Sequence, residues 1–275
     1  MSLRATIAAD LAAAGLAPLH RLGQNFMIDE HALSRLIDEL HLVPGERVVE
    51  VGPGTGVLTE RLLLSGARVL AVELDRGLVG LLTTKLVPRG LELVHGDALE
   101  SKSRLHPAIE RVAAEGPWKL GANLPYDIAL PVLLDAAALP RPPLLAVVTV
   151  QWEAAQRLCA QPGSDAWGAS AAVLQSAGTP AIVRRLGPGS FHPQPRVDSA
   201  ILRWTPARAL PAGFGVWCRA VFAARRKVLP RALRDAGQER APADAAVAAC
   251  GLDPSRRLES LTPDELLALH AAITP

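Results

Sequence analysis

Short apolar segments alternate with helical segments over residues 47–150, and this alternation constrains the fold more than any other feature of the chain. Repeated strand–helix units of this length predict a mainly parallel sheet with helices on both faces. The expected strands cover residues 47–51, 68–73, 91–95, 118–122 and 144–150.

The pattern changes after residue 150. Two further strands are expected at 181–186 and 198–204, which brings the sheet to seven strands. No convincing strand follows Pro206, whereas residues 214–224 and 229–236 look helical and the run from Thr262 to Glu265 is typical of a helix start. We therefore predict an α/β domain over residues 1–204 and a small all-helical domain over residues 205–275.

Composition excludes several classes of protein. Apolar residues make up 49% of the 275 residues, which is enough for a sizeable core. No apolar run approaches the roughly 20 residues that cross a bilayer, and the N-terminal residues lack the apolar block of a secretory signal. The three cysteines are widely separated and the seven histidines have no metal-ligand spacing. We expect a cytoplasmic protein without a membrane span, disulfide framework or metal site.

Positive charge is concentrated in one stretch of the chain. Residues 181–240 hold twelve Lys and Arg against three Asp and Glu, although the formal net charge of the whole chain is only +2. This asymmetry, together with the basic residues that follow Phe222, favours a surface that faces a polyanion such as RNA. A solvated basic helix face is the alternative. The candidate RNA-binding residues are Arg225, Arg226, Lys227, Arg231 and Arg234.

A glycine-rich loop and two acids mark a candidate ligand crevice. Gly52, Gly54 and Gly56 lie between a predicted strand and a predicted helix, with the compact spacing G-x-G-x-G. Such a loop lets the backbone approach a ligand closely, and its spacing fits a cofactor without a pyrophosphate. Glu73 ends the second strand, where its carboxylate can accept bonds from ribose hydroxyls, and Asp97 follows the third, where it can accept from an adenine amine.

The run from Asn123 to Tyr126 follows the fourth strand and contains the only tyrosine of the chain. An Asn side-chain oxygen and a backbone carbonyl held by Pro125 can both accept bonds from an exocyclic amine, which directs the lone pair of the nitrogen toward an electrophile. The ring of Tyr126 can stack on the base. An ordinary Asn- and Pro-containing turn is the alternative reading of these residues.

These motifs occur in an order that resembles the ribosomal RNA adenine N6,N6-dimethyltransferases of the KsgA type. The resemblance rests on the motifs that start at Gly23, Glu50, Glu73, Gly96 and Asn123. It continues through residues 151–157, 191–199, 222–227 and 257–262, and so covers nearly the whole chain. It implies a class I (Rossmann-like) methyltransferase domain, a helical RNA-binding domain, S-adenosylmethionine as the methyl donor and no metal.

The resemblance also implies a role for each site residue. The substrate would be two adjacent adenosines in a 3′-terminal hairpin of 16S rRNA, in the immature 30S particle, during small-subunit assembly. Tyr126 and Phe191 would sandwich the target base, and Asn123 would touch both the donor and the target nitrogen. The residues expected to hold the donor are Asn25, the backbone of Met27, Gly52, Glu73, Asp97 and Asn123.

Some residues depart from the family pattern, and other functions stay open. Asp127 adds a negative charge near the expected site, the stretch after Phe191 has lost one proline, and Trp152 stands where a Lys is common. The alternatives are a 23S rRNA adenine N6-methyltransferase and a mainly non-catalytic checkpoint factor of ribosome assembly. A DNA or protein N-methyltransferase is disfavoured by Leu124, and a dehydrogenase would leave the run from Asn123 to Tyr126 unexplained. Nothing in the sequence requires more than a monomer.

Overall fold

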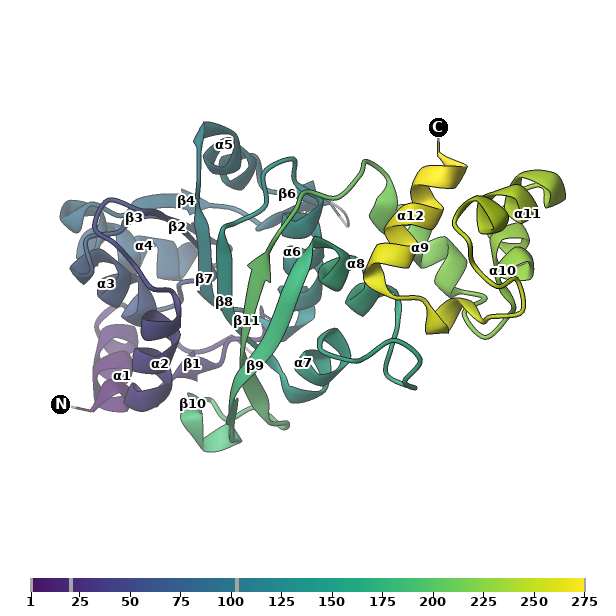
Figure 1. Ribbon diagram of the computed structural model, residues 1–275. Coiled ribbons are helices and arrows are strands. Elements are labelled where there is room, and N and C mark those ends of the chain that lie inside the picture. The colour runs from purple at the N-terminus through teal and green to yellow at the C-terminus, as the bar shows by residue number, and fades with distance from the viewer. Residues whose placement is uncertain (1, 20–21, 102–103, 275) are drawn as a thin grey trace.

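The computed structural model describes residues 2–19, 22–101 and 104–274 of the chain. Its main sheet contains β2 (Arg47–Val51), β3 (Arg68–Glu73), β4 (Glu92–His95), β7 (Lys119–Asn123), β8 (Leu145–Gln151), β9 (Gly178–Leu186) and β11 (Ser199–Pro206). The strand order is β4-β3-β2-β7-β8-β11-β9 (Figure 1). β11 is antiparallel to both of its neighbours, and the other pairs are parallel. The predicted α/β class with a seven-stranded, mainly parallel sheet is confirmed.

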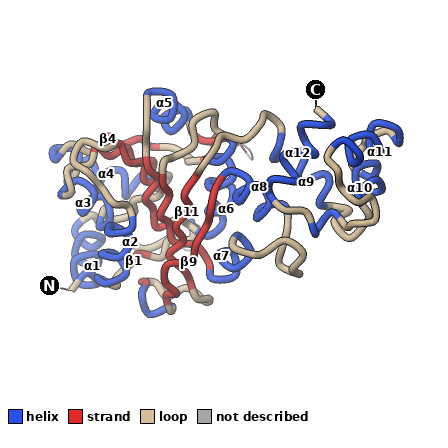
Figure 2. The backbone as a smooth tube through the Cα atoms, in the orientation of Figure 1, coloured by secondary structure: helices blue, strands red, loops and turns tan. Residues whose placement is uncertain are grey.

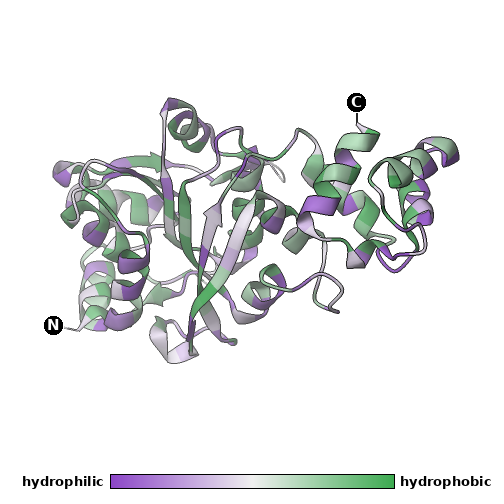
Figure 3. Ribbon diagram, in the orientation of Figure 1, coloured by the Kyte–Doolittle hydropathy of each residue, from purple (hydrophilic) through white to green (hydrophobic). Residues whose placement is uncertain are grey.

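Helices cover both faces of this sheet, because successive side chains of a strand point to opposite faces. In β2, Val48 packs into one apolar layer and Val49 into the other. The layer of Val48 includes residues of α2 (Glu30–Glu39), α3 (Val57–Leu64) and α4 (Arg76–Lys85), and α1 (Leu3–Ala13) packs beside it against Phe26. The layer of Val49 includes residues of α5 (Pro107–Glu115), α6 (Tyr126–Ala138) and α7 (Trp152–Leu158). Figure 3 shows β8 as mainly apolar and much of the edge strand β9 as paler.

Two small antiparallel ladders lie outside the main sheet. One pairs β5 (Leu99–Ser101) with β6 (Arg104–Leu105). The other pairs β1 (Phe26–Met27) with β10 (Phe191–His192), so that two segments 165 positions apart in sequence lie side by side (Figure 1). Strands of two or three residues show too little periodicity to be recognised, and they were not predicted from the sequence.

The C-terminal part of the chain is helical, as predicted (Figure 2). The apolar core of this part contains residues that follow β11 in sequence. It also contains Trp167 and Ala172, which precede β11. The helices are α8 (Ala169–Ala177), α9 (Phe214–Phe222), α10 (Leu229–Asp235), α11 (Arg240–Ala249) and α12 (Pro263–Ile273), with short 3-10 turns at Val87–Arg89, Pro188–Ser190 and Leu258–Ser260. The proposed boundary near residue 205 thus falls at the end of β11, whereas α8 packs with the helices that follow it.

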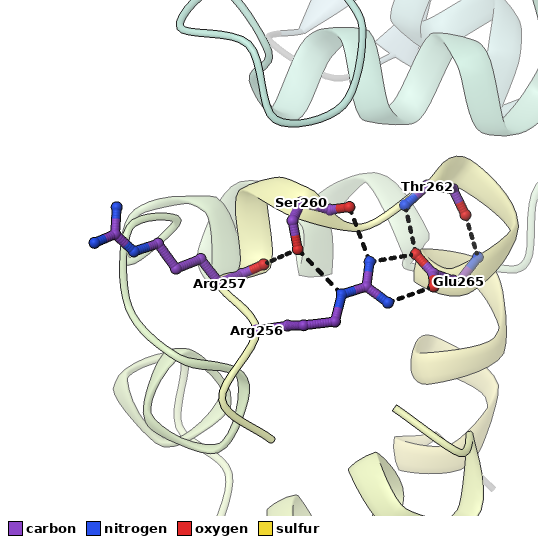
Figure 4. A network of polar contacts seen from close by, with 5 residues as sticks. All are labelled: Arg256, Arg257, Ser260, Thr262 and Glu265. Atoms are coloured by element: carbon purple, nitrogen blue, oxygen red, sulfur yellow. Dashed lines mark hydrogen bonds and ion pairs between the residues drawn. The ribbon is translucent and has the colours of Figure 1, made fainter. Parts of the chain in front are cut away.

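The start of α12 has the local structure that its sequence predicted. The Thr262 hydroxyl accepts a bond from the backbone N–H of Glu265, and the Glu265 carboxylate accepts one from the N–H of Thr262 (Figure 4). Arg256 also donates to Glu265, at 2.6 and 3.0 Å, and to the Ser260 carbonyl at 3.0 Å. This network attaches the preceding loop to the last helix. None of the helices in the described ranges combines the length and apolar character needed to span a bilayer.

Candidate active site

A cavity of about 260 Å³ opens where β2, β3, β4 and β7 end. The carboxyl ends of parallel strands meet at one edge of a sheet, where ligands of such folds bind. Seven of the predicted site residues line this cavity: Asn25, Met27, Gly52, Glu73, Asp97, Asn123 and Tyr126. The sheet therefore brings the donor-binding and target-binding candidates to one place.

The glycine loop lies directly against the N-terminal segment of the chain. Gly54 has φ +63°, and a Cβ atom there would lie 2.9 Å from the ring of Phe26. Gly52 has φ +66°, and its Cβ would lie 3.3 Å from Pro125. Both positions combine a left-handed backbone with close packing, so the loop needs glycine to pass between these segments.

The two predicted acids differ in their surroundings. Glu73 is buried, and its carboxylate accepts bonds from the backbone N–H groups of Gly54 at 3.1 Å and Asp75 at 2.8 Å. Desolvation nevertheless raises the pKa of Glu73 above its usual range. Asp97 is exposed and accepts one bond from the N–H of Leu99 at 2.9 Å. Glu73 is held rigidly at the cavity wall, and Asp97 lies at the solvent side.

Glu50 is a second buried acid in the cavity wall, and no role was predicted for it. It is only 1% exposed, and its Oε2 atom has no hydrogen-bond partner among the described residues. Desolvation, with the nearby charge of Glu73, raises the pKa of Glu50 to about 8. The Thr59 hydroxyl opposes this rise in pKa, and a positive charge in the cavity would oppose it further by stabilising the ionised carboxylate.

Asn123 is held by two partners on separate elements. Its amide nitrogen donates to the backbone carbonyl of Asn25 at 2.9 Å, and its side-chain oxygen accepts a bond from the buried hydroxyl of Thr149 on β8. These contacts fix the amide plane and leave a second lone pair on the oxygen. Thr149 could not be recognised as a site residue from the sequence. Its place opposite Asn123 depends on the register of β7 against β8.

Tyr126 is fixed by another buried hydroxyl. Its phenol oxygen lies 2.5 Å from the Ser199 hydroxyl at the start of β11. Burial raises the pKa of Tyr126, so the phenol stays neutral around pH 7. The ring therefore forms a neutral wall of the cavity.

Phe191 does not face the cavity in this structure. It is 1% exposed, belongs to the apolar layer of Leu33 and Leu36, and is absent from the described residues that line the cavity. β10 holds it opposite Met27 of β1. The expected sandwich of Tyr126 and Phe191 is therefore not formed here, and a stacking role for Phe191 stays a prediction.

The candidate RNA-binding residues lie around the start of α10, away from the cavity. Arg226 and Lys227 are exposed, whereas Arg231 pairs with Asp235 at 2.8 Å on the outside of that helix. Arg225 is turned inward: its guanidinium donates to the carbonyls of Trp167 and Asp165. Arg234 is half-buried and lies 4.0 Å from Asp244. These five residues do not share one environment, and their contact with RNA stays a prediction. In the described part of the chain no group of His, Cys, Asp and Glu has metal-binding geometry.

Comparison with known proteins decides the family. A family model described as "Ribosomal RNA adenine dimethylase" matches residues 19–274. The chain belongs to the ribosomal RNA adenine dimethylase family. A family member from Geobacter metallireducens, named "Ribosomal RNA small subunit methyltransferase A", is 40% identical over 94% of this chain and 96% of its own. A second, of the same name, from Thermosynechococcus vestitus is 39% identical over 92% of this chain and 96% of its own.

Two solved structures superpose on this chain over most of its length. A dimethyladenosine transferase from Plasmodium falciparum superposes with a TM-score of 0.70 at 19% identity, covering 89% of this chain and 95% of the other. The 23S rRNA methyltransferase ErmE superposes with a TM-score of 0.65 at 23% identity, covering 91% of this chain and all of the other. Both likenesses support the fold and leave the substrate to other observations.

Proposed function

We propose that this chain transfers methyl groups from S-adenosylmethionine to the N6 amines of two adjacent adenosines in the 3′-terminal hairpin of 16S rRNA. One observation carries the proposal: the turn of Asn123 and Tyr126 shares a cavity with the glycine loop and Glu73. The names of the relatives favour the small subunit over the large-subunit alternative.

The residues present fit the donor. Glu73 would accept bonds from ribose hydroxyls, Asp97 would accept from the adenine amine, and Gly52 would let the backbone pass close to the ligand. Asn25 and the backbone of Met27 would lie at the methionine end. The unpartnered oxygen of Glu50 is suited to a cationic ligand, because a positive charge would stabilise its ionised form.

Asn123 and the carbonyl of Leu124 would position the target nitrogen. Each would accept one N–H of the adenine N6 amine, so that the lone pair of the nitrogen points into the cavity. When bound, S-adenosylmethionine supplies a methyl group on a sulfonium, which is electrophilic enough to need no strong base. Tyr126 would hold the flipped base by stacking, which is worth roughly 1–3 kcal/mol per base.

The partner would be small-subunit RNA in an immature 30S particle. The protein would bind this particle as a monomer, in the cytoplasm. Arg226 and Lys227 would contact RNA phosphates through their exposed side chains. The helical part from residue 205 onward would carry this RNA-binding surface.

Nucleoside analysis tests the proposal. Purified protein, S-adenosylmethionine and immature small-subunit particles should yield N6,N6-dimethyladenosine in digested 16S rRNA, detected by mass spectrometry. Asn123→Ala is the control that should yield far less dimethyladenosine in the same reaction time. Methylation of 23S rRNA instead would move the assignment to the large subunit, and tight particle binding without methylation would indicate a checkpoint factor.

A further inference from the structure

A second hollow, of about 280 Å³, opens on the surface next to the candidate active site. It lies where β8 passes into α7 and where the loop before β11 meets the end of β9. Its lining residues are Gln151, Trp152, Glu153, Arg185, Val197 and Asp198.

Arg185 forms a fixed flat surface in this hollow. Its guanidinium carbon lies 4.7 Å from the centre of the Trp152 ring, so the indole supports one face of the guanidinium. The Asp198 carboxylate accepts bonds from Nε, at 2.8 Å, and from Nη2. The Arg185 side chain is still 59% exposed. The guanidinium is therefore held at one face and one edge while much of it remains open to solvent.

The hollow adjoins the wall that holds Tyr126. Asp198 directly precedes Ser199, whose hydroxyl meets the Tyr126 phenol. Ser199 is also paired with Gln151, a residue of the hollow, in the ladder of β11 and β8. A strand of RNA that delivers a base to Tyr126 would therefore pass beside Arg185.

We propose that this hollow binds an unpaired base that flanks the pair of target adenosines, stacked on the Arg185 guanidinium. The inference rests on the proposed function, because it requires an RNA substrate. A guanidinium plane is a common stacking surface for unstacked RNA bases, and Arg185 is already immobilised by Trp152 and Asp198, so stacking on it costs little additional side-chain entropy. Withdrawal of the target base from its strand removes a stacking partner from the neighbouring base, which Arg185 replaces.

The charge around the hollow complements an RNA backbone. Arg196, just before Val197, is exposed. Arg184 is also exposed, but it alternates with Arg185 along β9 and so points to the opposite face of the sheet, toward Asp29. No ion pair within the described ranges involves Arg196, so its charge is available to a phosphate beside the hollow. Glu153 adds a carboxylate at the rim, but it is paired with Arg157 at 2.7 Å.

Base stacking differs from simple charge attraction in its response to Arg185→Lys. Lysine keeps the charge but loses the plane, so Arg185→Lys and Arg185→Ala should both weaken particle binding about tenfold, which corresponds to about 1.4 kcal/mol. Arg61→Ala is the matched control, since Arg61 on α3 is an exposed arginine paired with a carboxylate, that of Glu30 on α2, at 2.9 Å, outside the region that would bind RNA. It should bind the particle like the unaltered protein.

Fluorescence of a labelled particle gives the direct measurement. Small-subunit particles would carry 2-aminopurine, whose fluorescence falls on stacking, on either side of the two adenosines. The unaltered protein should quench the label at one position, and the two Arg185 variants should not, while their S-adenosylmethionine affinity and melting temperature stay unchanged. Full binding by Arg185→Lys, or methylation by the unaltered protein without quenching at either position, would overturn the stacking site alone. Absence of methylation by the unaltered protein would instead overturn the proposed function.

Discussion

Replacing Glu50 with glutamine tests whether a buried, uncharged carboxyl lies behind the glycine loop. The pKa of Glu50 is raised from 4.5 to about 8 by burial, so the folded chain holds a proton that the unfolded chain releases above pH 4.5. Glu50 therefore leaves the free energy of unfolding undiminished below pH 4.5. As the pH rises from there toward 8, burial of this carboxyl lowers the free energy of unfolding progressively. Glutamine keeps the shape of the neutral carboxyl and does not titrate.

The expected size of this effect follows from the pKa. Each pH unit within the window changes the free energy of unfolding by about 1.4 kcal/mol, so from pH 5 to 7.5 the protein should lose about 3 kcal/mol relative to Glu50→Gln. Urea unfolding followed by circular dichroism at several pH values measures this difference. With a slope of about 1–3 kcal/mol per molar urea, the two midpoints should separate by about 1 M or more.

A control and a contrary outcome define the test. Glu239 is exposed at the start of α11. The free energy of unfolding of Glu239→Gln should therefore change with pH in the same way as that of the unaltered protein. Parallel curves for Glu50→Gln as well would mean that the Glu50 carboxyl is ionised or hydrated in the folded chain. That result would refute the argument from its burial.

Three further predictions concern catalysis and RNA binding. Asn123→Ala should lower kcat about 100-fold or more and change the particle Kd less than about threefold, measured by single-turnover methylation and by binding; equal losses in both would contradict the lone-pair argument. Replacing Arg226 and Lys227 together with Ala should weaken particle binding and lower the slope of log Kd against log salt by about 1 for each lost phosphate contact; an unchanged slope would place the RNA surface elsewhere. Arg225→Ala should mainly lower the melting temperature, because it leaves the buried carbonyl of Trp167 without its hydrogen-bond donor, at a cost of about 1–3 kcal/mol. An unaltered melting temperature with lost RNA binding would show that Arg225 contacts RNA and does not stabilise the fold.

Donor binding supplies a fourth, linked prediction. If a cationic donor lies beside Glu50, its binding should favour the ionised carboxyl and release a proton between about pH 6 and 8, so affinity should rise with pH. Calorimetry in two buffers of different ionisation enthalpy measures this proton. The same experiment on Glu50→Gln should show no proton release, and release that persists there would assign the proton to another group.

Much of the site could be predicted from local sequence because the sheet imposes its geometry. Glu73 ends β3 and Asp97 follows the neighbouring parallel strand β4, so their places at one edge were implied once the strands were recognised. Asn123 ends β7, which pairs with β2 on the side opposite β3, so its place at the same edge was implied in the same way. The capped start of α12 likewise depends on residues within three positions of one another.

The predictions that needed side-chain environments were less complete. Phe191 was expected to face the target base, yet it packs in the apolar layer, because β10 pairs with a two-residue strand that no periodicity reveals. The basic run from Arg225 was treated as one RNA-binding group, yet Arg225 is directed toward the loop before α8. A run of like charges in a sequence shows how many charges are present. The direction of each side chain depends on the tertiary structure.

The amino-acid sequence alone determined the order of strands and helices, the edge of the sheet at which the cavity opens, and the family to which the motifs belong. These properties follow from the spacing of apolar residues and from short motifs, which act over a few positions. Only the tertiary structure decided that Thr149 holds Asn123, that Ser199 holds Tyr126, and that Trp152 supports Arg185. Each of these contacts joins side chains from segments separated in sequence, and its existence depends on the register in which those segments pack.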